Sequence, residues 1–433
     1  MSDVRERFCR AVSARDAAGL RRLLEREPAA AHLVDAPIFP FDAPAIVNIS
    51  GRGDVALLDV LLDFGADPNR RSDWWAGGFH ALYHATAPEA DRLIAAGAVP
   101  DACAAAHLDR PDLLASMLDA DSSRVHERGG DGQTPLHFAR SPAVADLLLE
   151  RGADIDATDV DHRSPPAAWM LDRRPGAGRF ELAGYLVEAG ASADVFLAAA
   201  LGLVDRLASL LADDPSVVEA RTGHGAYGPQ GRSSHHIYFW TLGPNLSPLH
   251  VAARFEQPAA VELLGALAGA RARFLVDCAT ARADEARRLL AEQPGLREEL
   301  TPADHAALAH AAWAAEADAV ELMVELGFDP AAPGQDGGSA LHCAAWVGSV
   351  RSVEAILATR SGRALLEARD PSHGGTPLDW CCHGASQPGR VVDDYAEVAR
   401  RLLDAGGRPG PLGAAVPARL RTVIEEHARG PRS

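Results

Sequence analysis

The chain has 433 residues, a formal net charge of −18 and six cysteines, none of which forms a Cys-x-x-Cys pair. The acidic balance argues against sequence-independent nucleic-acid binding and against anionic membranes, and the cysteine spacing suggests neither a disulfide framework nor a zinc finger. No lysine occurs in the chain, which argues against P-loop nucleotide binding, protein-kinase activity and pyridoxal catalysis, because each depends on a lysine.

The first seven residues are rich in charge and lead straight into a helix, without the apolar core of a signal peptide. No apolar run is long enough to span a membrane. We therefore expect a cytoplasmic protein with no nucleic-acid partner and no membrane partner. The abundance of arginine and alanine also suggests a GC-rich bacterial genome.

A helix pair is predicted over residues 5–35. Its second helix ends in a Leu-Leu-x-x-x-Pro motif, in which the proline cannot continue the helix. The same motif recurs near residues 210 and 289. Residues 102–128 and 195–222 also resemble each other, and both open with an alanine-rich helix. Two kinds of helix pair therefore mix along the chain.

Residues 131–157 contain the clearest motif. They include Asp-Gly-Gln-Thr-Pro-Leu-His-Phe-Ala and then Val-Ala-Asp-Leu-Leu-Leu-Glu-Arg-Gly-Ala-Asp. Thr134 can cap a helix that opens with Pro135, whose missing N–H costs nothing in a first turn. Gly152 stands where a second helix needs a left-handed stop. This stretch resembles an ankyrin repeat, a helical unit that must stack on neighbours to bury its apolar face.

The signature recurs along nearly the whole chain. The helix opening returns near residues 247, 339 and 376, and the glycine that ends the second helix returns near 65, 97, 190 and 327. The resemblance implies an all-α ankyrin-repeat solenoid of about twelve helix pairs with short hairpin-like loops. We expect one continuous array over residues 1–411, with insertions near 33–44, 70–80, 221–244 and 384–394. Residues 412–433 should form a capping helix and tail with a charged outer face.

Several histidines have a structural role in this motif. His137, His250 and His342 occupy the position where, in the family, the imidazole commonly hydrogen-bonds the backbone and orients the turn. Tyr83 falls at the same place in an earlier repeat, so the adjacent His84 is available for another role or for core packing.

Three insertions, 33–44, 70–80 and 221–244, are unusually aromatic. Disordered linkers generally lack aromatic residues, and long ordered loops in compact arrays are often functional. Trp74 and Trp75 in the second insertion could contact a partner or pack within their own loop. The tryptophans of later helices, such as Trp346 and Trp380, could line a groove or fill the core.

The third insertion concentrates chemically active side chains. If its final segment is extended, His236, Tyr238 and Trp240 share one face and His235 points to the other. The segment would then form a platform for a ligand. Alternatively, the loop tucks these aromatic side chains into the array.

Other motifs do not indicate a site. The G-x-G-x-x-G spelling at residues 223–228 follows no predicted strand, and the Asp-Asp-x-x-Glu spelling at 393–397 lies where carboxylates complement a helix dipole. A calcium-like run of aspartates is ordinary ankyrin usage: Asp154, Asp156, Asp159 and Asp161. We therefore predict no cofactor and no metal site.

The family resemblance implies a binding scaffold, because ankyrin arrays mostly recognise proteins through loop tips and inner helices. We expect a protein or peptide partner in the concave groove. Aromatic and arginine side chains dominate interface centres, so the predicted contacts are Arg71, Trp74, Trp75, Arg232, His236, Tyr238 and Trp240.

The alternative is a small-molecule-binding protein or an unusual enzyme. Its three aromatic insertions would close over an apolar pocket, and a histidine would supply acid/base chemistry. The catalytic candidates are His80, His84, His235, His236 and Tyr238. A third alternative is an adaptor whose insertions only make an irregular array rigid.

Overall fold

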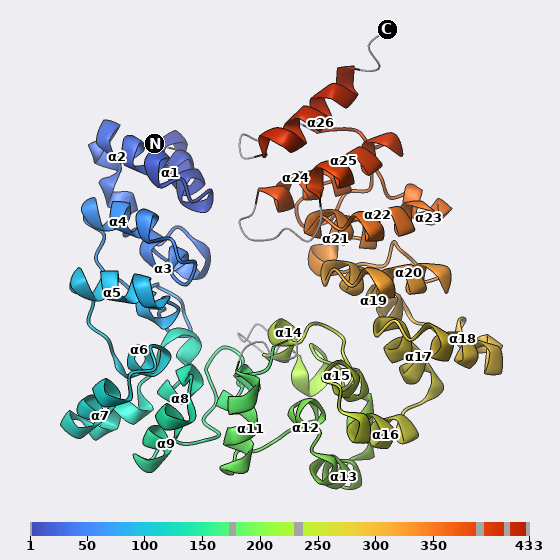
Figure 1. The fold of residues 1–433 in the computed structure, drawn as a ribbon, viewed down its shortest axis with the longest axis horizontal. Coiled ribbons are helices and arrows are strands. Elements are labelled where there is room, and N and C mark those ends of the chain that lie inside the picture. Colours follow the sequence, from blue (N-terminus) through green and yellow to red (C-terminus); the bar gives the residue numbers. More distant parts are fainter. Residues whose placement is uncertain (1, 173–178, 229–236, 387–393, 411–415, 430–433) are drawn as a thin grey trace. The chain divides into compact units, whose positions relative to one another are not determined.

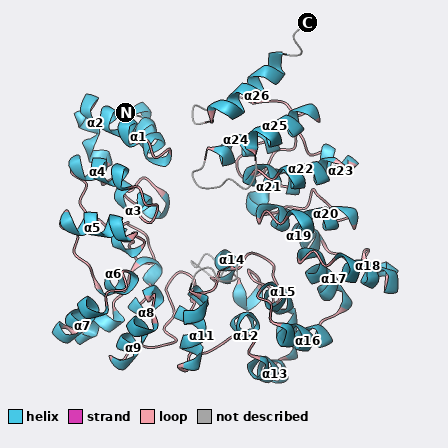
Figure 2. Ribbon diagram, in the orientation of Figure 1, coloured by secondary structure: helices cyan, strands magenta, loops and turns pink. Residues whose placement is uncertain are grey.

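The computed structural model describes residues 2–172, 179–228, 237–386, 394–410 and 416–429. Its described elements are helices joined by turns and loops, as Figure 2 shows, and the all-α prediction is confirmed. The helices group into two compact units, unit 1 (residues 1–201 and 220–244) and unit 2 (residues 202–219 and 245–433). None of these helices has the length and hydropathy needed to cross a bilayer.

Unit 1 contains helix pairs that follow one another along the chain (Figure 1). Its helices are α1 Ser2–Ser13, α2 Ala17–Arg26, α3 Ala45–Ile49, α4 Val55–Asp63, α5 Ala87–Ala95, α6 Ala102–His107, α7 Pro111–Ala120, α8 Pro135–Phe138, α9 Pro142–Glu150, α10 Pro166–Trp169, α11 Phe180–Glu188, α12 Val195–Leu201 and α14 Tyr238–Thr241. Short 3-10 turns connect them, among them η2 Pro40–Asp42, η3 Ala81–Tyr83 and η5 Gly130–Gly132.

Unit 2 repeats this arrangement with longer inner helices. Its helices are α13 Val204–Asp213, α15 Pro248–Arg254, α16 Pro258–Leu267, α17 Ala270–Ala279, α18 Ala283–Glu292, α19 Pro302–Trp313, α20 Ala317–Glu325, α21 Ala340–Val347, α22 Val350–Leu357, α23 Arg360–Arg363, α24 Pro377–Ala385, α25 Tyr395–Asp404 and α26 Ala418–Arg429. The predicted closing helix is α26, which packs on α25 and buries Leu420 and Ile424 while its other face is charged and exposed.

Local sequence explains where these helices begin and end. Thr134 is the N-cap of α8, Pro135 fills its first turn, and Gly152 follows α9 with a φ of 90°. These are the roles predicted from the motif, because a proline lacks the N–H that the first turn cannot use and glycine adopts positive φ without a Cβ clash.

The motif histidines join consecutive repeats. In α8, the Nδ1 of His137 accepts the Thr134 amide at 3.0 Å, and its Nε2 donates to the Ser164 carbonyl of the next repeat at 3.0 Å. His342 bonds the Ser339 amide and the Ala368 carbonyl in the same way. The structural role predicted for these two imidazoles is confirmed.

Small side chains allow the helices to pack closely. The inner helix α6 is buried along Ala102, Cys103 and three further alanines. Burial raises the pKa of the Cys103 thiol, as it does for Cys278, Cys343 and Cys381. These cysteines therefore act as small apolar core residues.

The extended conformation considered for the end of the third insertion is not present at residues 238–241. These residues form the short helix α14, so the argument that places Tyr238 and Trp240 on one face of a strand does not apply. The insertions near 33–44 and 70–80 are ordered and form the surface described below. A single continuous array over residues 1–411 stays a prediction.

Candidate functional site

A tight turn in the first insertion presents an exposed phenylalanine. Phe39 and Ala43 exchange backbone hydrogen bonds of 3.1 and 3.3 Å, and Phe41 lies at the tip with 52% of its surface exposed. Phe41 has a φ of 63° and Asp42 a φ of 50°. Positive φ is uncommon for a bulky residue and costs roughly 1 kcal/mol, so such strain often marks a functional position.

The second insertion closes on itself and on this turn. Ser72 and Phe79 exchange two hydrogen bonds of 2.9 Å, and the Asp73 amide donates to the Asp42 carbonyl at 3.0 Å. The rings of Phe41 and Trp74 meet edge to face at 5.2 Å, and Trp74 lies 6.0 Å from Trp75. We call Phe41, Trp74 and Trp75 the aromatic cluster.

The base of this loop is held by a buried tyrosine. Tyr83 is completely buried, and its hydroxyl donates to Asp101 at 2.6 Å while accepting from Arg71 at 2.6 Å. Arg71 also forms an ion pair with Asp101. The Arg71 guanidinium, which was predicted to contact a partner, is therefore bonded within the protein and stabilises the base of the loop.

The tip of the loop rests on the next repeat. Trp74 donates its Nε1–H to Oδ1 of Asp131 at 3.0 Å. Gly77 has a φ of 147° and lies against the 129–132 turn, where a Cβ would overlap the Gly129 carbonyl oxygen and lie 2.7 Å from the Gly132 amide nitrogen. This close approach places the aromatic cluster directly beside Asp131.

We expect Gly77→Ala to separate this loop from the 129–132 turn and to lower the free energy of unfolding by roughly 2–3 kcal/mol, because the new Cβ has no space and the φ is unfavourable. Urea denaturation should measure the loss, and the tryptophan emission of the chain should shift toward that of solvated indole as Trp74 loses its contacts. Gly53→Ala is the matched control, since that glycine also has positive φ but open space around it. Equal losses in both variants would mean that contact with the turn contributes nothing.

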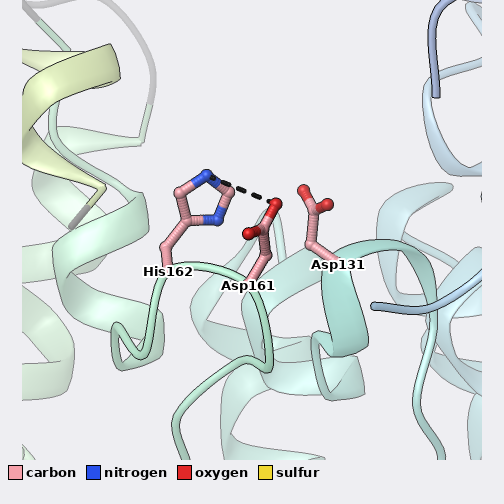
Figure 3. Close-up of side chains that lie close together, drawn as sticks. All are labelled: Asp131, Asp161 and His162. Atoms are coloured by element: carbon pink, nitrogen blue, oxygen red, sulfur yellow. Dashed lines mark ion pairs between the residues drawn. The ribbon is translucent and has the colours of Figure 1, made fainter. Parts of the chain in front are cut away.

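Below the aromatic cluster, three ionisable side chains converge. Asp131 comes from the 129–132 turn, and Asp161 and His162 come from the corresponding loop of the next repeat (Figure 3). They are 6%, 2% and 8% exposed, and one ligand atom from each lies within 4.8 Å of the others. We call these residues the Asp–Asp–His trio.

Backbone hydrogen bonds bring the two loops together. The Asp131 carbonyl accepts the amides of Val160 and Asp161 at 2.9 and 3.2 Å. Asp159 organises the second loop, because its carboxylate accepts the His162 and Ser164 amides and the Trp169 indole N–H. The position of the trio thus follows from the way successive repeats stack.

Burial and neighbouring charge perturb the pKa of each group. Burial raises the pKa of Asp131 to about 7, and the Asp161 and Asp159 carboxylates add to this effect. Desolvation lowers the pKa of His162, but the surrounding carboxylates, Asp159 foremost, outweigh it and raise the pKa overall. Neighbouring ionisable side chains whose pKa values are shifted by burial and by each other's charge are typical of functional sites.

On its other side, the aromatic cluster continues toward a basic region. Phe41 contacts Phe79 at 5.3 Å, Phe79 contacts His84 at 6.0 Å, and His84 lies 6.2 Å from His107 (ring centroids). His84 is exposed and His107 is half-buried. The basic region also includes two arginines, Arg140 and Arg179. Desolvation, together with the charge of these arginines, lowers the pKa of His107 to about 4.

The basic region lacks acidic partners among the described residues. The charge that acts on Arg179 is that of Arg140, and its guanidinium donates to the carbonyls of His137 and Ala139. No ion pair of Arg140 or Arg179 occurs within the described ranges. Desolvation, then Arg140, lowers the pKa of Arg179 to about 10. A basic region without counter-charges is notable in a chain of net charge −18.

Other predicted site residues are dispersed. His80 is 3% exposed, its Nδ1 accepts the Leu82 amide, and desolvation lowers its pKa to about 4. Tyr238 is 1% exposed and donates to Asp194 at 3.0 Å, so it is not available as a surface contact. Trp240 is 48% exposed. Arg232, His235 and His236 lie outside the described residues.

The tryptophans of unit 2 contact one another, with Trp313 stacked on Trp346 and Trp346 edge to face with Trp380. Trp313 and Trp346 lie 5.7 Å apart, and Trp346 and Trp380 lie 5.8 Å apart. Trp380 is buried and the other two are half-buried, so core packing accounts for much of this set.

Sequence reasoning missed Phe41, Asp131, His162, Arg140 and Arg179. Asp131 and His162 belong to different repeats, and neither has a spacing that indicates a shared site. Phe41 lies in the aromatic insertion 33–44, and nothing in the sequence sets it apart from the other phenylalanine of that insertion.

A match to a family model supports the repeat assignment. The ankyrin-repeat family model matches residues 131–160. Among solved structures, the human ASB11 ankyrin repeat domain is 18% identical, with 72% of this chain and all of that domain covered and a TM-score of 0.24. No curated protein matches the chain.

Proposed function

We propose that this chain, which is an ankyrin-repeat protein, is a binding scaffold that holds a protein or peptide segment on unit 1. The aromatic cluster would take bulky apolar side chains of the partner, and the basic region around Arg140 and Arg179 would take its acidic side chains. The partner is thus an acidic segment with an apolar anchor.

The observation that supports this most is the exposed aromatic cluster held at the cost of backbone strain. Phe41 is 52% and Trp75 44% exposed, and Phe41 is displayed at a φ of 63°. Solvent exposure of large rings is unfavourable by about 25 cal/mol per Å² of apolar surface. Rigid aromatic side chains of this kind dominate the binding energy of protein interfaces.

Continuity with the basic region supports the acidic part of the proposal. The rings of Phe79, His84 and His107 connect the aromatic cluster to Arg140 and Arg179 within one unit. Charge complementarity contributes to partner choice and to the rate of association. An acidic segment would supply the counter-charges that the described residues do not provide.

The enzyme alternative receives less support. Of its candidates, His80 and Tyr238 are buried and engaged in hydrogen bonds within the protein, His80 with the Leu82 amide and Tyr238 with Asp194. His84 remains exposed, but it lies next to the Phe79 ring and the His107 imidazole, and the charge that acts on it is that of Arg179. The described residues thus favour recognition.

A peptide-display selection against the full chain tests this function. Selected peptides should combine an aromatic or aliphatic residue with acidic residues. Trp75→Ala should weaken their binding at least ~30-fold, which corresponds to about 2 kcal/mol. Trp240→Ala, which removes another exposed tryptophan of unit 1, is the control and should bind normally. Fluorescence polarisation with labelled peptides gives the affinities.

Two further variants sharpen this test. Phe41→Gly and Phe41→Ala should both bind weakly, but the glycine variant should be about 1 kcal/mol more stable because glycine adopts positive φ without strain. Arg140→Ala should weaken acidic peptides and leave neutral analogues unaffected. Selection of no common peptide class, or full binding by Trp75→Ala, would contradict the proposed function.

A further inference from the structure

The Asp–Asp–His trio is a site of a kind that the proposed function does not require. We propose that Asp131, Asp161 and His162 bind one divalent transition-metal cation, with Zn²⁺ as the reference ion, and that this cation joins two successive loops of unit 1. Cation binding depends on these three ligands and does not require that the aromatic cluster binds a partner.

The ligand set fits such an ion. Two carboxylates and one imidazole offer oxygen and nitrogen ligands, which Zn²⁺ and its first-row neighbours accept in three-residue sites with a fourth position open. One ligand atom from each residue already lies within 4.8 Å of the others. A tetrahedral Zn²⁺ site needs ligand atoms roughly 3.4 Å apart, so modest side-chain rotations would complete it.

The orientation of the imidazole also fits. His162 turns its Nε2 toward Asp161, 4.0 Å from Oδ2, and its Nδ1 toward Asp159, 3.7 Å from Oδ1. In metal sites, a ligating histidine usually directs its other ring nitrogen to a carboxylate, which sets the tautomer and the ring orientation. Asp159 is in place for that role, because three backbone amides and the Trp169 indole already hold it.

An open carboxylate oxygen provides a second, independent indication of a ligand. Within the described residues, the Asp131 carboxylate accepts one hydrogen bond, from Trp74 to Oδ1. Its Oδ2 is left without a donor, although the residue is only 6% exposed and the side chain points toward the same side as Asp161 and His162 (Figure 3). A buried carboxylate without full compensation is costly, and a cation would supply the missing interaction.

A corresponding pair of loops in unit 2 shows what the repeat fold alone requires. Asp370 caps its loop and accepts the Trp380 indole N–H, just as Asp159 accepts that of Trp169. The positions that correspond to the trio are Asp336, Ser372 and His373, and all three are exposed.

The difference between these loops is informative. Both of the stacked loops in unit 2 form with a serine in place of the second carboxylate, and the Ser372 hydroxyl donates to the Asp336 carbonyl. The ankyrin turn therefore needs neither the second carboxylate nor the burial of the trio. In unit 1, Asp161 stands where unit 2 has Ser372 and supplies the third ligand. The 70–80 insertion, through Gly77, also covers Asp131 and shelters it from water.

Metal content is the direct test. The full chain is exposed to one equivalent of Zn²⁺, passed over a weak chelating resin, and analysed by inductively coupled plasma mass spectrometry beside isothermal titration with Zn²⁺, Mn²⁺ and Ca²⁺. The site variants are Asp131→Asn, which keeps an acceptor for Trp74, Asp161→Asn and His162→Gln. The matched controls are Asp336→Asn and His373→Gln. Circular dichroism checks that each variant is folded.

We expect one retained Zn²⁺ in the wild type and in both controls, and at least tenfold weaker binding in each site variant. Zn²⁺ should also raise the melting temperature of the wild type and not that of Asp161→Asn. Absence of retained metal in the wild type would overturn the proposal. So would equal binding by the site variants, which would place the ion elsewhere, or loss of binding in the controls.

Discussion

Replacement of Tyr83 by alanine is expected to lower the free energy of unfolding of unit 1 by about 3–5 kcal/mol. The side chain is completely buried, packs against Phe138 with the ring centroids 4.9 Å apart, and joins Arg71 to Asp101 through its hydroxyl. Alanine leaves a cavity. It also removes the hydroxyl that links Arg71, at the base of the 70–80 loop, to Asp101 of the next repeat. Few single substitutions in unit 1 should cost more.

Tyr83→Phe separates the two contributions. It keeps the ring and removes the hydroxyl, so it should cost about 1–2 kcal/mol. Hydrogen exchange followed by mass spectrometry should show the loss of protection in unit 1 for the alanine variant. Because repeat proteins are stabilised by neighbouring contacts, unit 2 should keep its protection. A uniform loss over both units, or a loss below about 1 kcal/mol in Tyr83→Ala, would show that the tyrosine does not anchor this region.

The second large effect is acid destabilisation through His137. Desolvation lowers the pKa of this buried imidazole to about 4, whereas in an unfolded chain it is about 6.5. Between these values the unfolded state binds the proton and the folded state does not. The stabilisation is therefore present above about pH 6.5 and is lost as the pH falls toward 4. The difference corresponds to about 3 kcal/mol.

Protonation of Asp131 changes the folding stability in the opposite direction, so its contribution must be separated from that of His137. Its pKa of about 7 in the folded state means that the folded chain binds its proton first, so protonation of Asp131 adds stability as the pH falls from 7 to 4. For this reason the expected result is a difference between two proteins measured at the same pH. A pH series on the wild type alone would mix the two contributions.

His137→Gln supplies that difference. Glutamine can accept the Thr134 amide and donate to the Ser164 carbonyl, as in a capping box, but does not titrate. The variant should be about 1–2 kcal/mol less stable than the wild type at pH 7.5 and equal to it or more stable at pH 4.5. His126→Gln, at an exposed position, is the control for removal of a histidine. A constant difference between wild type and His137→Gln across this range would contradict the assignment.

The aromatic cluster and the trio share one physical link. Trp74 packs on Phe41 through its ring and donates to Asp131 through its Nε1. A change at Asp131 should therefore alter the position of the tryptophan, and the Asp131→Asn variant proposed above retains the acceptor for this reason. Peptide affinity and metal affinity can then be measured as separate properties of neighbouring groups.

The sequence by itself determined the architecture. The caps, prolines and terminal glycines act within one helix pair, and the Thr-Pro-Leu-His and Gly-Ala-Asp motifs are therefore readable without knowledge of the neighbours. It also singled out the 70–80 insertion, because two adjacent tryptophans are unusual in a loop. Such features depend on residues a few positions apart.

Only the tertiary structure decided which of those residues face solvent and which lie together. Tyr238 and Trp240 are two residues apart, yet one is buried on Asp194 and the other is exposed. Asp131 meets His162 because successive repeats stack, about thirty positions apart in the chain. The burial, the hydrogen-bond partners and the charge environment of a side chain depend on contacts between repeats. A periodic motif is the same in every repeat, so it does not show where an insertion from one repeat covers another.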